Sequence, residues 1–220
     1  MHELRPVIAG VEYTLCTPED TDAMASLLAD AFTQHDPPAV AVGLTADEFK
    51  SFVELWSHRA GTDGLSIIGR DVDSQKVVGA LLTEDAAATP PKGIEQTSSK
   101  LEPILDLLGQ LDAEYREGTV IEAGRHLHLF LLGVDPAYTR RKIGHNLVEM
   151  CLRNGAVRGY QTAFAEATNP VSQHIFGQHG FEARVSRLYG EYRLGDAAVF
   201  TSIADQGGPK LMDRTIGEPT

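Results

Sequence analysis

The 220-residue sequence predicts an α/β domain built around a mixed β-sheet. The main support is the order of the segments after residue 124. A dense apolar run at 125–134, too apolar for an edge strand, precedes a helix-period pattern and a second strand-like run at 160–167, which is the order of a parallel β-α-β unit. Strand-like segments on both sides of this unit predict antiparallel neighbours. The expected order of elements is βα-α-ββ-α-βα-βα-ββ.

The first third of the chain predicts one strand and two helices. Residues 11–16 alternate as a strand does, and residues 17–32 begin with a Thr-Pro helix start followed by acidic residues. The two prolines at 37–38 prevent this helix from continuing. Residues 45–59 then open with Thr-x-x-Glu, the capping box that starts a second helix.

A hairpin and an insertion follow. The segments 65–71 and 76–83 flank a short turn and predict an antiparallel pair. Residues 84–117 form an insertion within the domain, because strands resume directly after it. Within this insertion, Ser99 and Glu102 form a second predicted capping box, which opens a helix.

The last third predicts a short helix, a pair of strands and a tail. Residues 170–178 form the helix, which ends at His-Gly. The segments 184–194 and 197–203 predict a terminal antiparallel pair. We therefore expect a single domain over residues 1–205 and a polar, mobile tail over 206–220.

Composition excludes several classes of function. The formal net charge of −12 and the isoelectric point of about 5.0 leave no basic surface for nucleic acid. The sequence shows no signal peptide and no apolar window that approaches the roughly 20 residues of a membrane span, so we expect a soluble, cytoplasmic protein without a membrane partner. Cys16 and Cys151 belong to no CxxC pair, which gives neither a disulfide framework nor a zinc ribbon any support.

Three consecutive cations, Arg140, Arg141 and Lys142, stand in the turn between the dense strand and its helix. A helix N-terminus presents unpaired backbone N–H groups and partial positive charge, so this turn predicts a site for a phosphate-bearing ligand. A solvated basic loop is the alternative interpretation. The turn contains neither the P-loop pattern nor the GxGxxG dinucleotide pattern.

Residues 134–144, Val-Asp-Pro-Ala-Tyr-Thr-Arg-Arg-Lys-Ile-Gly, resemble motif A of the GNAT superfamily of N-acetyltransferases. In that motif, Val-x-Pro-x-Tyr/Phe precedes Arg-x-x-Gly-x-Gly/Ala and a helix. Here Thr139 replaces the usual Arg or Gln, Lys142 replaces the first Gly, and Gly144 keeps the second. The resemblance implies that the turn binds the diphosphate of acetyl-CoA as co-substrate, with the three cations adding charge. The implied donor-binding residues are Leu132, Gly133, Val134, Thr139, Arg140, Arg141, Lys142, Ile143, Gly144 and His145.

Residues 167–182 resemble motif B of the same family, with Asn169, Ser172, Phe176, Gly180 and Phe181 at matching places. The first three of these are therefore also expected to contact the coenzyme. The resemblance covers about residues 127–181 and implies the GNAT fold. That fold is a mixed, mostly antiparallel twisted sheet with a central parallel strand pair, flanked by helices on both faces.

Acetyl transfer to an amine requires a general base poised near neutral pH. His126 and His128 lie two apart on the dense strand, so both project from the same face, and the pair resembles the His-x-His of vertebrate arylalkylamine N-acetyltransferases. Asp36 competes, because "AFTQHDPP" resembles the acidic residue before Pro in the insect-type arylalkylamine and polyamine enzymes. Either His128 or Asp36 could serve. Phe176 stands where the family often has the Tyr that protonates the leaving thiolate, so Ser172 or water is expected to replace it.

We therefore expect an acetyl-CoA-dependent N-acetyltransferase that transfers the acetyl group directly, in a ternary complex, to a small, cationic primary amine. Family resemblance also suggests a homodimer. A second interpretation is a GNAT-fold module that binds acyl-CoA with little catalysis. A third is a metal enzyme in which His126 and His128 supply two ligands, although nothing in the sequence fixes a third ligand.

Overall fold

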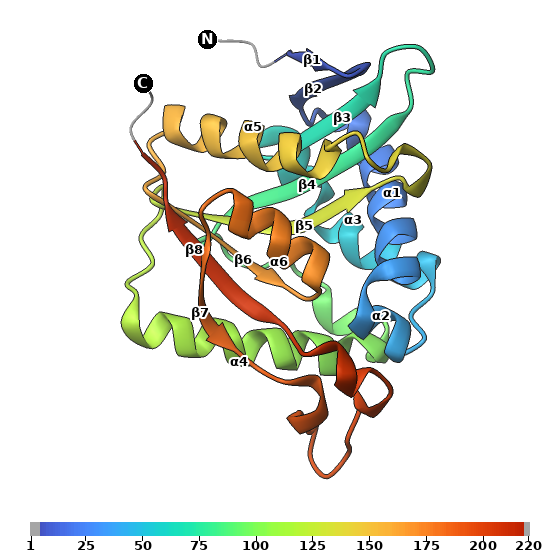
Figure 1. Cartoon of the computed structure of the whole chain (residues 1–220), viewed down its shortest axis with the longest axis vertical. Helices are drawn as coiled ribbons and strands as arrows, with labels where there is room; N and C mark the ends of the chain where they lie inside the picture. Colours follow the sequence, from blue (N-terminus) through green and yellow to red (C-terminus); the bar gives the residue numbers. More distant parts are fainter. Residues whose placement is uncertain (1–4, 218–220) are drawn as a thin grey trace.

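The computed structural model describes residues 5–217, which form an eight-stranded sheet in the order β1-β2-β3-β4-β5-β6-β8-β7 (Figure 1). The strands are β1 (Val7–Ile8), β2 (Val11–Leu15), β3 (Ile67–Asp71), β4 (Val77–Asp85), β5 (His126–Val134), β6 (Thr162–Ala167), β7 (Glu182–Ser186) and β8 (Lys210–Thr215). The β5–β6 pair is parallel, and the other neighbours are antiparallel. This arrangement confirms the predicted mixed, mostly antiparallel sheet with a central parallel pair.

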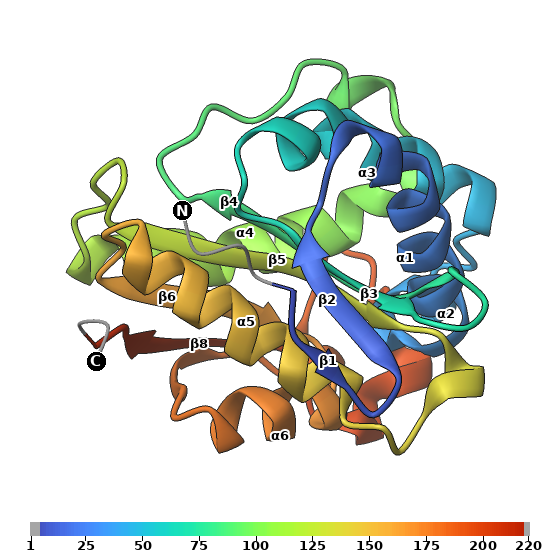
Figure 2. The same ribbon diagram turned by 90° about the horizontal axis from the view of Figure 1, so that it is seen from above.

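Helices cover both faces of the sheet. They are α1 (Thr21–His35), α2 (Pro37–Ala41), α3 (Ala46–Thr62), α4 (Glu102–Gly118), α5 (Ile143–Val157) and α6 (Pro170–Gln178). Figure 2 shows α1, α3 and α4 on one side of the sheet and α5 and α6 on the other. Each side buries its own apolar cluster, so the sheet lies between two cores.

The helix starts follow local chemistry, with one error in the prediction. The capping box of Thr45 and Glu48 forms as expected at the start of α3. The box predicted for Ser99 and Glu102 is wrong. Ser98 instead accepts a hydrogen bond from the N–H of Lys100 and caps a short 3-10 turn that leads into α4.

The two adjacent prolines have a second effect that the sequence did not reveal. They end α1 as predicted, but they also begin α2, since proline fits the first helical positions. Asp36 lies between the two helices and caps α2 by accepting the N–H of Ala39. The backbone N–H of Asp36 donates to the carbonyl of Phe32 on α1, so the residue is hydrogen-bonded to both helices.

The predictions for the C-terminal segments need correction. Residues 197–203 form no strand; 3-10 turns over Thr201–Gln206 place Phe200 and Ile203 in the core. The expected mobile tail is also wrong over Lys210–Thr215, which forms β8 between β6 and β7. A strand with neighbours on both edges buries consecutive apolar residues, here Leu211 and Met212, and so shows no alternation in the sequence.

β5 contains the irregularity that creates the site. Leu131 pairs with Leu82, but Leu129 pairs with Thr83, so Phe130 is the extra residue of a β-bulge. The parallel pairing between β5 and β6 covers only the first three residues of β5, His126–His128. The two strands therefore diverge after residue 128, and the β6-facing backbone of the second half of β5 has no strand partner.

Candidate active site

A cavity of about 530 Å³ opens where β5 and β6 diverge, between the C-terminal end of α1 and the N-terminal ends of α5 and α6. Residues from both resemblance motifs meet here, together with the acidic residue from the end of α1. The predicted residues that line the cavity are Asp36, Leu132, Gly133, Val134, Thr139, Gly144, Asn169 and Ser172. The divergence of the two strands therefore brings the residues expected to bind the coenzyme and the candidate base Asp36 to one place.

Gly133 allows α1 to lie directly against the end of β5. A Cβ at this position would lie 2.9 Å from Leu28 and 3.2 Å from Ala31, both on α1. A side chain at this position would displace the end of the Leu28 side chain and crowd Ala31, so glycine lets α1 lie close to the strand. Gly133 thus favours a short distance between the two walls of the cavity.

The turn before α5 presents its backbone N–H groups without intramolecular acceptors. Arg140 and Lys142 both take left-handed backbone conformations, with φ angles of 68° and 57°. Within the described chain, the N–H groups of residues 140–145 have no hydrogen-bond acceptor. Successive free N–H groups at a helix N-terminus suit an anion such as a diphosphate.

The three cations of this turn differ in their surroundings. Arg141 has its guanidinium 3.6 Å from the carboxylate of Asp71 and 4.9 Å from the ring centroid of Tyr138. Arg140 and Lys142 are exposed at the surface. Arg141 is therefore partly neutralised and held against the protein, whereas the other two charges point toward solvent, where a ligand could meet them.

Asp36 is a buried carboxylate, only 6% exposed, at the wall of the cavity. Its oxygens accept hydrogen bonds from the N–H of Ala39, at 3.3 Å, and from the hydroxyl of Thr168. Burial raises the pKa of Asp36 to about 6, although hydrogen bonds from Thr168, Ala39 and Asn169 lower it in part. A carboxylate with this pKa can accept a proton at neutral pH.

Thr168 is a functional candidate that the sequence did not identify. It follows β6 directly and precedes Asn169, the N-cap of α6. The hydroxyl of the buried Tyr189 donates to its backbone carbonyl at 2.5 Å, while its own hydroxyl donates to Asp36. A chain of hydrogen bonds therefore fixes the orientation of the Asp36 carboxylate.

Comparison with known proteins identifies the family. The model of the acetyltransferase (GNAT) family matches residues 47–181, more than half of the chain. The chain belongs to the GNAT family. It is accordingly an acyltransferase, and its parallel β5–β6 pair within a mostly antiparallel sheet is that of the GNAT fold.

Solved structures across the whole domain share this GNAT fold. The C-terminal condensation domain of Ebony, in complex with beta-alanyl-dopamine, superposes with a TM-score of 0.85 at 16% identity, covering 94% of this chain and 99% of that one. Arylalkylamine N-acetyltransferase 2 from Aedes aegypti gives 0.75 at 17% identity, with 94% and 99% covered. The polyamine N-acetyltransferase of Drosophila melanogaster gives 0.73 at 16% identity, with 93% and 99% covered.

His128 lies outside the cavity of this GNAT enzyme, in the half of β5 that still pairs with β6. Its Nε2 lies 2.7 Å from Glu166 and its Nδ1 3.3 Å from Glu84, and its ring stacks on Phe164 at 4.7 Å. Burial alone would lower the pKa of His128, but the two carboxylates raise it to about 10. An imidazolium that is already protonated at neutral pH cannot accept a proton, so the geometry argues against the predicted role as base.

Several other predicted residues of the GNAT site also lie away from the cavity. His126 accepts the N–H of Glu122 at 3.2 Å on the far half of β5. Phe176 is buried against Phe181, with ring centroids 5.1 Å apart. Like these residues, the buried Ile143 and the half-buried His145 do not line the cavity, whereas Ser172 does.

The part of the chain that the structure describes lacks two features: a cluster of metal ligands and a membrane-spanning helix. Over residues 5–217, no group of three or more His, Cys, Asp or Glu side chains is arranged to hold a metal ion. Both ring nitrogens of His128, one of the two proposed ligands, already face carboxylates. The same residues include no helix with the length and apolarity needed to cross a bilayer.

Proposed function

We propose that this GNAT enzyme is an acetyl-CoA-dependent N-acetyltransferase that acts on a primary monoamine with an apolar substituent. The observation that carries the proposal is the position of Asp36. Its buried carboxylate faces the same cavity as the end of β5, and it has no cationic partner among the described residues. The cytoplasmic location and the homodimer stay predictions.

Acetyl-CoA, the acetyl donor, is expected to bind along the end of β5 with its diphosphate at the turn before α5. The free N–H groups of residues 140–145 and the exposed Arg140 and Lys142 support this placement. Replacing Arg140, Arg141 and Lys142 together with Ala should raise the KM for acetyl-CoA by about tenfold or more, equivalent to one charge-assisted hydrogen bond. Arg153→Ala, which removes an exposed cation from α5, is the control. An unchanged KM in the triple variant would contradict this placement.

The proposed reaction is a direct transfer. Asp36 takes a proton from the ammonium group of the acceptor, and the neutral amine then attacks the thioester carbonyl carbon. The N–C bond forms and the C–S bond breaks. The second proton of the nitrogen passes to the leaving thiolate, through Ser172 or water, and Asp36 returns its proton to solvent. Backbone N–H groups at Leu132 to Val134 are the proposed donors to the oxyanion.

The lining of the cavity favours a monoamine over a polyamine. Asp36 and His35 are the ionisable side chains among the residues that line it. A second ammonium group of a polyamine would therefore lose water without gaining a carboxylate. The remaining wall is largely apolar, including Phe32, Val171 and Ile175, so it offers no charge to a second ammonium group.

The test is a panel of primary amines with acetyl-CoA, followed by release of free thiol. Monoamines should give turnover, with lower kcat/KM for polyamines. A β-alanyl thioester belongs in the panel as an alternative donor, because the similar Ebony domain was solved with beta-alanyl-dopamine. Tight binding of acetyl-CoA without thiol release for any amine would instead favour a module that binds acyl-CoA without efficient catalysis.

A further inference from the structure

A second, smaller cavity of about 40 Å³ lies directly behind Asp36. It shares Phe32 and Asp36 with the large cavity, so these two side chains lie between the two spaces. An acceptor whose nitrogen contacts Asp36 could therefore extend its substituent into the small cavity. The space is thus a candidate subsite for that substituent.

The walls of the small cavity come from different parts of the fold. Phe49 and Phe52 of α3, together with Phe130 at the bulge of β5, form an aromatic wall. Leu105 and Leu108, one helical turn apart on α4, contribute to the opposite wall. Because α4 belongs to the 84–117 insertion, the insertion closes this space.

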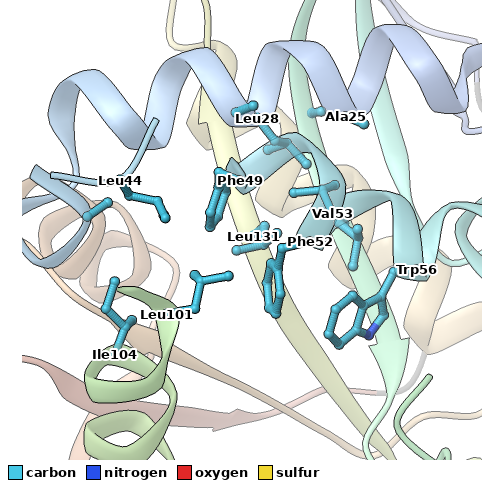
Figure 3. Packing of buried hydrophobic residues seen from close by; sticks show 14 of the residues in the cluster. Ala25, Leu28, Leu44, Phe49, Phe52, Val53, Trp56, Leu101, Ile104 and Leu131 are labelled. Carbon is cyan, nitrogen blue, oxygen red and sulfur yellow. The ribbon is translucent and has the colours of Figure 1, made fainter. Parts of the chain in front are cut away.

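Figure 3 shows how the two walls approach one another. Leu101, in the 3-10 turn before α4, and Ile104 of α4 lie across from Phe49 and Phe52, and Leu131 lies between the two phenylalanines. Leu101 is 1% exposed and Phe52 is 2% exposed, so this part of the contact is tightly packed. Leu105 and Leu108 are half-buried, which makes them easier to change without loss of the core.

The volume decides which substituents fit. An apolar cavity that binds benzene measures about 150 Å³, and a single water needs about 10 to 15 Å³. The cavity behind Asp36, at about 40 Å³, therefore has room for roughly three water-sized groups and excludes an aromatic ring. A short alkyl chain fits this space, and the leucines of α4 set its limit.

We propose that α4 sets the size limit for the acceptor, because Leu105 and Leu108 close the subsite for the amine substituent behind Asp36. Short aliphatic monoamines enter this subsite, and arylalkylamines do not. Truncating either leucine enlarges the subsite and admits a ring. This inference rests on the proposed N-acetyltransferase function.

The test compares Leu108→Ala with Leu107→Ala, the same truncation at the neighbouring position on α4. Leu107 is 1% exposed and lies in the core but does not line the subsite. In Leu108→Ala, the ratio of kcat/KM for 2-phenylethylamine to that for propylamine should rise at least about tenfold, because each buried methylene contributes roughly fourfold. In Leu107→Ala, the ratio should stay at the wild-type value. Leu108→Phe, which fills the space, should lower kcat/KM for propylamine.

Calorimetric titration of the same variants with 2-phenylethylamine gives a second measurement that needs no turnover. Tighter binding to Leu108→Ala than to the wild type supports the inference even if the thiol assay fails. An unchanged ratio together with unchanged binding in Leu108→Ala overturns it, and so does an equal change in Leu107→Ala. Absence of thiol release with every amine would contradict the proposed function, while the titration would still decide the role of α4.

Discussion

Two ionisable groups with little solvent exposure, the buried Asp36 and the partly buried His128, have opposite electrostatic surroundings. Asp36 is surrounded by neutral hydrogen-bond donors, and burial raises its pKa to about 6. His128 is enclosed by Glu84 and Glu166, and their charges raise its pKa to about 10. The first group can change its protonation near neutral pH, whereas the second keeps its proton.

The difference shows that burial alone does not indicate a catalytic group. Desolvation without an opposite charge leaves a carboxylate poised near neutrality, which suits proton transfer. Desolvation with opposite charges fixes the ion and makes it part of the packing. Access agrees with this distinction, because Asp36 lines the large cavity and His128 does not.

The largest effect is expected from removing the proposed base. Asp36→Asn keeps the size of the side chain but cannot accept the proton, so kcat/KM should fall by about 10² to 10⁴. In the wild type, kcat/KM should rise with pH through about 6, as Asp36 loses its proton. The variant should lose this limb of the profile, measured by thiol release between pH 5 and 8.

The control for this experiment is Asp30→Asn, an exposed aspartate on α1 outside the large cavity. Its rate should stay within about twofold of the wild type, since surface substitutions cause small changes. Retention of more than a tenth of the activity in Asp36→Asn would mean that another group acts as the base.

The next largest effect is expected on the free energy of unfolding when His128 is replaced. His128→Ala removes the imidazolium that pairs with Glu84 and Glu166. Arg59 still pairs with Glu84, but Glu166, whose side chain is 8% exposed, loses this cation, so the free energy of unfolding should fall by about 3 to 5 kcal/mol. Turnover at a temperature where the variant is folded should be nearly unchanged. Urea unfolding and the thiol assay measure the two properties separately.

His126→Ala is the matched control, because it removes a histidine from the same face of β5 whose ring accepts a hydrogen bond from the N–H of Glu122 and, within residues 5–217, pairs with no carboxylate. Its stability should change by less than about 1 kcal/mol. The comparison would fail if His128→Ala lost activity while its unfolding midpoint stayed at the wild-type value.

The sequence predicted the fold well where local patterns determine structure. The βα turn before α5, the capping box of α3 and the hairpin of β3 and β4 depend on residues within a few positions of each other. β8 could not be predicted in this way, because its central position between β6 and β7 arises only in the assembled sheet. The same is true of the insertion of Phe130 as a bulge, which depends on the pairing with β4.

The same distinction between local patterns and long-range contacts applies to the candidate site. Family motifs gave the residues that line the cavity at the end of β5 and the start of α6. The two candidate bases could not be separated from the sequence, since the carboxylates around His128 come from β4 and β6. Thr168 was missed because its contact with Asp36 spans 132 positions in the chain. Long-range contacts therefore decide the proton chemistry that local sequence leaves open.

Stability as a function of pH gives a smaller but direct contrast between the two groups. Since the pKa of Asp36 is raised from 3.8 to about 6, its ionisation lowers the free energy of unfolding above pH 6, and this penalty disappears as the pH falls toward 4. Asp36→Asn should therefore be more stable than the wild type by about 1 to 3 kcal/mol at pH 7. The difference should vanish near pH 4, as measured by urea unfolding.

His128 should stabilise the fold rather than destabilise it, and this contribution should change in a higher pH range. Its raised pKa contributes stability that is complete below about 6.5 and is lost as the pH rises toward 10. The wild type should therefore lose stability between pH 7 and 10, and His128→Ala should lose less over the same range. An Asp36→Asn variant less stable than the wild type at pH 7 would contradict the account of Asp36.

The smallest expected effect concerns the pKa of Asp36. It tests whether an uncharged hydrogen-bond donor, the hydroxyl of Thr168, lowers this pKa. The hydroxyl of Thr168 donates to the carboxylate and so lowers the pKa that burial raises. In Thr168→Val this bond is lost at nearly constant size, so the midpoint of the rise in kcat/KM with pH should move upward by roughly one pH unit. The rate well above the midpoint should be retained, and Thr168→Ser, which keeps the hydroxyl, should restore the wild-type midpoint. A midpoint that does not move in the valine variant would show that Thr168 contributes only to packing. The pKa of Asp36 would then be set by desolvation alone, in contrast to the pKa of His128, which is set by neighbouring charges.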